Sequence, residues 1–161
     1  RAAAELERRR AVAPRTVTSD LEAFFGPYER AVENLKAQDR SAIPTALAFL
    51  EADPECFRSG YMKADLMHAL ANGPDLSRHR ARVQGIVVHR LRDPRPRLLR
   101  HTARLAAAVW DDELARQVAE IYDLGDDRQR RDAERLRALV ANHRRSVSDR
   151  SQDDPPGTSG R

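Results

Sequence analysis

LSRHRARVQGIVVHRLRDPRPRLLRHTARLAAAVW, residues 76–110, decides the predicted fold of this chain. Apolar residues recur every three or four positions on both sides of Asp93 and Pro94, which is the spacing of one face of an α-helix. A helix rarely continues through an Asp-Pro pair, because proline has no backbone N–H and restricts the residue before it. The stretch therefore predicts two helices that fold back on each other around Asp93-Pro94.

The same stretch carries most of the unbalanced positive charge. From Arg78 to Arg104 there are nine arginines and one acidic residue, Asp93, whereas the whole chain of 161 residues has a formal net charge of only +4. The rest of the chain is therefore net acidic. Two interpretations are open: the arginines form a surface that binds anions, or they are solvated side chains that pair with the acidic remainder.

The composition indicates one all-α domain. A chain of this length corresponds to about one domain, and Ala, Leu and Arg, which favour helices, are abundant while strand-type runs are scarce. The single cysteine, Cys56, leaves no internal disulfide and fits a reducing compartment, so we expect a cytoplasmic protein. No run approaches the ~20 apolar residues that a membrane-spanning helix needs, so we expect no membrane partner.

The sequence divides into three parts. Residues 1–18 are predicted to form an N-terminal helix and linker, which could belong to a larger unit because the sequence begins with Arg1. Residues 19–145 carry the helical periodicity and form the predicted repeat domain. Residues 146–161 are polar and rich in Ser, Asp, Pro and Gly, and we expect this tail to be disordered because it buries too little apolar area to order the chain.

Start and stop signals bound the expected helices. Ser19 with Glu22 resembles a capping box, Ser41 is the expected cap of the second helix, and Gly26-Pro27 predicts a kink or restart within the first. Helices are expected over about residues 19–35, 41–52, 55–72, 75–92, 96–110, 111–124 and 127–145.

Helical hairpins recur along the chain. Asp53-Pro54 and Asp93-Pro94 lie 40 residues apart, each between two amphipathic helices, and a further turn follows at Asp126. Such a period is typical of an α-solenoid.

The repeated stretches resemble the HEAT-repeat family. In LRDPRPRLLRHTARLA, from residue 91, the family's turn, arginine and small positions are matched by Asp93, Pro94, Arg100, Ala103 and Ala106. LEADPECFRSG, from residue 50, matches Asp53, Pro54 and Arg58, and the third copy lacks the proline. The resemblance implies an all-α, right-handed stack of about three antiparallel helical hairpins with N-terminal capping helices. It also implies that the second helix of each hairpin lines the concave side.

HEAT-like proteins mostly bind other macromolecules, and most are not catalysts. The resemblance therefore implies a scaffold or adaptor that binds a protein with an acidic surface through an Arg-rich concave face. The concave candidates are Arg97, Arg100, His101 and Arg104. By the same resemblance, the stripe of Arg78, Arg82 and Arg92 faces the convex side.

Some of these candidates have simpler structural interpretations. Arg100 could instead bond back to Asp93, as the family's repeat arginine commonly does. Tyr61 and His68 share the outward face of their helix, with Ala64 and Ala71 between them. They predict a docking groove, ordinary surface or packing against the next hairpin.

Nucleic-acid binding is the alternative function. Trp110, Asp111 and Asp112 weakly resemble the concave site of HEAT-like alkylpurine DNA glycosylases, but the two aspartates also suit the start of a helix. Aromatic residues do not interleave with the arginine stripe, which disfavours base stacking.

Catalytic and metal-binding motifs are not evident in the sequence. The five histidines have no partners at ligand spacing, and no phosphate loop or nucleophile motif occurs, so we predict no enzyme, metal or cofactor. Cys56 is predicted to be a buried apolar thiol. The oligomeric state is left open.

Overall fold

Helices make up the regular structure of this chain. The computed structural model describes residues 20, 22–93 and 98–152, and within these residues it contains helices and no strand. The prediction of an all-α fold is confirmed. The predictions for residues 1–18, for the Ser19 capping box, for Pro94 and for the end of the tail lie outside the described residues.

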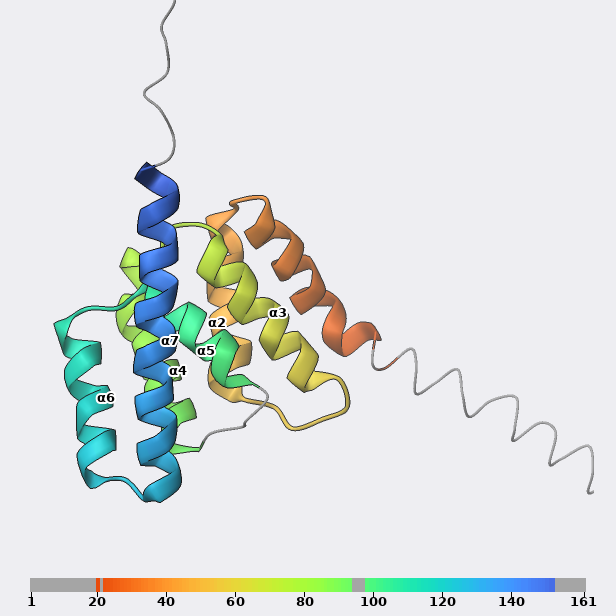
Figure 1. Cartoon of the computed structure of the whole chain (residues 1–161). Coiled ribbons are helices and arrows are strands. Elements are labelled where there is room, and N and C mark those ends of the chain that lie inside the picture. The colour runs from red at the N-terminus through yellow and green to blue at the C-terminus, as the bar shows by residue number, and fades with distance from the viewer. Residues whose placement is uncertain (1–19, 21, 94–97, 153–161) are drawn as a thin grey trace, which may run out of the picture.

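The first described helix spans residues 22–36 and continues through Gly26 and Pro27, so the expected restart does not occur. It is followed by η1 (Arg40–Ala42), α2 (Ile43–Ala52), α3 (Ser59–Asn72), η2 (Ser77–His79), α4 (Arg80–Arg92), α5 (Leu99–Ala108), α6 (Asp112–Leu124) and α7 (Asp127–Gln152). In Figure 1, α7 extends past the neighbouring helices at its C-terminal end.

Two rows of helices pack against each other. Successive helices are in contact as the pairs α2–α3, α4–α5 and α6–α7. Each helix also contacts the helix two places further along the chain, so that α2, α4 and α6 form one row and α3, α5 and α7 form the other. Helix α5 lies between α3 and α7 (Figure 1). The exposed surface of α5 is therefore bordered by those two helices.

Burial of a Leu, Ile, Val, Met or Phe side chain stabilises a fold by about 1.5–3 kcal/mol. The core is formed by apolar residues at helical spacing. Those that are buried include Leu35, Ile43, Leu47, Leu50, Met62, Leu66, Leu70, Leu99, Ala103, Ala106, Leu114, Val118, Leu136 and Val140. Phe24 at the outer end of the first helix remains 44% exposed.

Three predicted helix boundaries are wrong. Asp39 and not Ser41 caps the second helical segment, because its side chain accepts a bond from the Ser41 backbone N–H. Helix α3 begins at Ser59 and not near residue 55, because Arg58 adopts a left-handed conformation with φ 68°. Helix α7 continues beyond Arg145 to Gln152. Residues 146–152 contain no Gly or Pro, and extending an existing helix costs little.

Candidate functional site

Two arginines of α4 are engaged in ion pairs within the chain. Arg82 donates two hydrogen bonds to the carboxylate of Glu51, with donor–acceptor distances of 2.8 and 2.7 Å. Arg80 Nη1 lies 3.2 Å from Asp111 Oδ2. For these residues the structure supports the interpretation that the basic run pairs with the acidic remainder of the chain.

A buried ionic cluster joins three elements, and the sequence did not indicate it. Arg90 at the end of α4 donates to Asp53 Oδ1 over 2.7 Å, and Lys63 of α3 pairs with the same oxygen. The side chains of Arg90 and Lys63 are only 4% and 1% exposed. Arg90 follows the buried Val83 and Val87 at helical spacing, which is the signal that could have placed it inside.

The environment of Asp53 favours its charged form. Burial alone would raise the pKa of this carboxyl, but the hydrogen bond from Lys63 and the charges of Arg90 and Lys63 outweigh it. The pKa of Asp53 is therefore held below its ordinary value of 3.8. The cluster is a structural device that fixes the turn after α2 to α4.

The arginines of α5 differ from Arg80, Arg82 and Arg90 of α4, although Arg92 at the end of α4 is likewise exposed and forms no ion pair with a carboxylate among the described residues. Arg100 and Arg104 are exposed, and neither forms an ion pair with a carboxylate in the part of the chain that the structure describes. The suggested bond from Arg100 to Asp93 is not formed, and Asp93 is itself exposed. Arg97, the third arginine predicted for this surface, lies outside the described residues.

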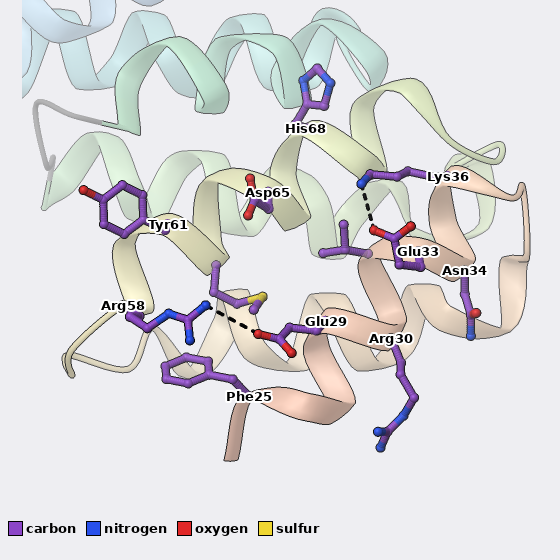
Figure 2. Close-up of a pocket in the computed structure, with 12 residues that line it drawn as sticks. Phe25, Glu29, Arg30, Glu33, Asn34, Lys36, Arg58, Tyr61, Asp65 and His68 are labelled. Carbon is purple, nitrogen blue, oxygen red and sulfur yellow. Dashed lines mark hydrogen bonds and ion pairs between the residues drawn. The ribbon is translucent and has the colours of Figure 1, made fainter. Parts of the chain in front are cut away.

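Arg104 connects α5 to α3. Its Nη1 lies 3.1 Å from Nδ1 of His68, a residue that the sequence predicted for a separate surface. Figure 2 shows His68 on the side of α3 that faces away from the first helix. The two candidate surfaces, the arginines of α5 and the Tyr61–His68 pair of α3, are therefore one continuous face, which we call the α3–α5 face.

His101 lies on the same face and is half-buried. Its Nδ1 is buried and has no hydrogen-bond partner in the described structure. Burial, followed by the charges of Arg104 and His68, lowers the pKa of His101 below its ordinary value of 6.5, while Asp65 acts weakly in the opposite direction. The imidazole of His101 is therefore neutral near pH 7.

A groove borders this face where α3 meets the first helix. It has a volume of about 650 Å³ and is lined by Phe25, Glu29 and Glu33 of the first helix and by Tyr61, Asp65 and His68 of α3, among others. Figure 2 shows Tyr61, Asp65 and His68 in succession along α3. Tyr61 is 76% exposed. Tyr61 and His68 therefore line a groove, and His68 also contacts Arg104 of α5; that the groove docks a partner stays a prediction.

Of the two aspartates beside Trp110, Asp111 has a structural role. Asp111 caps α6, because its Oδ1 accepts from the Leu114 backbone N–H over 2.9 Å. Gln84 also donates to that oxygen over 2.8 Å, and Trp110 is half-buried against the core. Asp112 is exposed in the first turn. The helix-start interpretation of Asp111 is confirmed.

Cys56 is exposed, so the prediction of a buried thiol is wrong. It lies in the turn before α3, because that helix begins at Ser59 and not at residue 55. Ser59 holds this turn through bonds between its hydroxyl and the backbone of Cys56.

Comparison of the chain with protein-family models, with curated proteins and with solved structures finds no match in any of the three. None of the described helices is long and apolar enough to cross a membrane. In the same residues, no three His, Cys, Asp or Glu side chains gather in a way that could hold a metal ion. Any proposal for the function therefore rests on the α3–α5 face itself.

Proposed function

We propose that this protein is a non-catalytic scaffold that binds an acidic segment of a partner protein on the α3–α5 face. The observation that carries the proposal is the unequal pairing of the basic run. Arg80, Arg82 and Arg90 have carboxylate partners within the chain, whereas Arg100 and Arg104 have none among the described residues. A guanidinium without a carboxylate keeps its donors available for a ligand.

The groove adds apolar contact beside the positive charge. Tyr61 is largely exposed, and exposed aromatic side chains often dominate the binding energy of an interface. A segment that lays carboxylates on Arg100 and Arg104 and an apolar side chain against Tyr61 would use both parts of the face.

We further propose that the architecture is a HEAT-like α-solenoid. Support comes from the contacts of each helix with its successor and with the helix two places later, which is the arrangement of stacked hairpins. In such a stack α3, α5 and α7 are the second helices of their hairpins. The α3–α5 face would then lie on the concave side, which repeat proteins commonly use for binding.

The test is fluorescence anisotropy with a labelled Glu-rich peptide at low salt. Arg100→Gln with Arg104→Gln should weaken binding about 5- to 30-fold, because each exposed charge contact contributes up to about 1 kcal/mol. The matched control is Arg78→Gln with Arg116→Gln, which removes the same charge from η2 and α6. Helix α6 has no contact with α3 or α5.

The control protein should bind within about twofold of the unmodified chain. Equal losses in both double variants would show that only net charge matters and would overturn the proposed face. Tight binding to duplex DNA with a steep loss on added salt, and none to the peptide, would replace the protein partner by nucleic acid.

A further inference from the structure

We infer that His68, His101 and Arg104 form one oxyanion site, which binds an acidic group of the partner and takes up protons on its imidazoles as it does so. The inference rests on the function proposed for the α3–α5 face and names the chemistry of its ligand. It starts from the contact between Arg104 Nη1 and His68 Nδ1, at 3.1 Å.

That contact selects one tautomer of His68. Arginine has only donors, so Nδ1 of His68 accepts the bond, and the tautomer that suits this contact carries its hydrogen on Nε2. Protonation of His68 would place a hydrogen on Nδ1, which removes the bond and brings two cations together. An anion between them would offset that repulsion.

Protonation of His101 would also be favoured by a nearby anion. It lies three residues before Arg104 on α5, and residues three apart share a helix face. The charged groups that act on it are Arg104 of α5 together with His68 and Asp65 of α3. Its buried Nδ1 has no partner in the described residues. A proton on His101 thus meets more positive than negative charge and a partly dehydrated site, and a bound oxyanion would supply the missing negative charge.

The groups around His68 are also accounted for. On α3 they are Asp65 one turn earlier and Asn72 one turn later. The amide of Asn72 donates to the His68 carbonyl over 2.8 Å, and its nitrogen lies 3.4 Å from each ring nitrogen of His68. From the first helix, Lys36 lines the groove and pairs with Glu33. Arg104 faces it from α5. The carboxylate of Glu33 is thus engaged by Lys36.

Oxyanion binding and histidine protonation are therefore linked, and this linkage sets the direction in which affinity changes with pH. An oxyanion stabilises the imidazolium form, so it raises the pKa of His101. By reciprocity, protonated imidazoles bind the oxyanion more tightly. Affinity is highest at acidic pH and falls as pH rises through the pKa values of the complex, by up to about tenfold per pH unit for each proton taken up.

The test is an NMR titration of the five histidines in the whole chain, with sulfate as the probe and chloride at equal ionic strength as the reference. Sulfate keeps its charge between pH 5 and 8. The pKa of His101 should rise by about 0.5 or more in sulfate. The ring signals of His68 should also differ between sulfate and chloride, whereas those of His79 and His143 should not. Arg104→Gln should remove most of the rise, and Arg78→Gln should leave it intact.

Equal changes in the ring signals of all five histidines, no rise in the pKa of His101, or a rise that survives Arg104→Gln would each overturn the site. A peptide experiment at pH 6 and pH 8 separates this inference from the proposed function. If peptide binding requires Arg100 and Arg104 but does not depend on pH, the proton linkage is wrong and the proposed scaffold function is retained. If the histidine signals respond to sulfate but the peptide does not bind, the oxyanion site is retained and the proposed scaffold function is wrong. Peptides with a central glutamate or a central phosphoserine, compared at both pH values, show whether a carboxylate or a phosphate is the better ligand.

Discussion

Arg90 Nη2 lies 2.7 Å from Asp53 Oδ1, and this bond joins the last turn of α4 to the turn that follows α2. Lys63 of α3 pairs with the same oxygen. One carboxylate therefore holds two nearly buried cations from different helices. Removing a single partner from a buried ionic cluster leaves charge that water cannot reach, so the fold depends on Asp53 more than its place in a turn suggests.

Asp53→Asn should destabilise the protein by about 3 kcal/mol or more, because Arg90 and Lys63 lose their shared counter-charge. Asparagine tolerates the left-handed backbone of this position, where φ is 44°, so the loss reports charge and not strain. Urea unfolding followed by circular dichroism measures it.

Asp93→Asn is the matched control, because Asp93 also ends a helix before a proline but is exposed and bonds through its backbone only. Its effect should stay within about 0.5 kcal/mol. Similar losses at Asp53 and Asp93 would contradict the cluster.

The stabilising effect of Asp53 should depend on pH in one direction. Its folded pKa lies below 3.8, so the contribution is complete above the unfolded value and is lost as pH falls through the folded one. The difference in unfolding free energy between the natural chain and Asp53→Asn should be constant from pH 7 to 5 and shrink below about pH 4. A difference that grows on acidification would reverse the assigned sign.

Asp111 and Asp112 should behave differently although they are neighbours. Asp111→Ala removes the cap of α6 and the acceptor for Gln84, so the melting temperature should fall. Asp112→Ala removes an exposed side chain of the first turn and should lower it less. Asp111→Asn, which retains a capping oxygen, should recover most of the loss. Equal melting temperatures for the two alanine variants would argue against the capping role.

The exposed arginines of the α3–α5 face should be dispensable for folding. Arg100→Gln and Arg104→Gln break no carboxylate pair in the described residues, so each should change the unfolding free energy by no more than about 0.5 kcal/mol. Arg90→Gln removes a cation of the buried cluster and should cost several times as much. The unfolding free energies of the three variants can be compared by urea denaturation. A large decrease for Arg104→Gln would show that Arg104 has a structural role.

Helical periodicity predicted the helices, because apolar spacing depends on neighbours along the chain. The contacts that assemble the site join residues that are distant in sequence. Arg104 and His68 lie 36 residues apart, and Arg90 and Asp53 lie 37 apart. The sequence pattern alone does not say which side chains of different helices meet.

The partners of the charged residues were also not predicted correctly from the sequence. Charged residues were expected at the surface, which hid Lys63 and Arg90 although both fall at buried helical positions. Arg100 was matched with Asp93 in its own hairpin, whereas the carboxylate partners of Arg80, Arg82 and Arg90 all come from other elements. The turn residue Asp53 therefore has a structural role that its pattern did not reveal.

Binding of an acidic partner to the α3–α5 face can be mapped by backbone amide chemical shifts. A Glu-rich peptide is added to the isotope-labelled chain at pH 6 and low salt. The largest shifts should cluster at Tyr61, His68, His101 and Arg104, with little change at Arg78 and Arg116. Shifts centred on η2 and α6, or spread evenly over the exposed arginines, would contradict it.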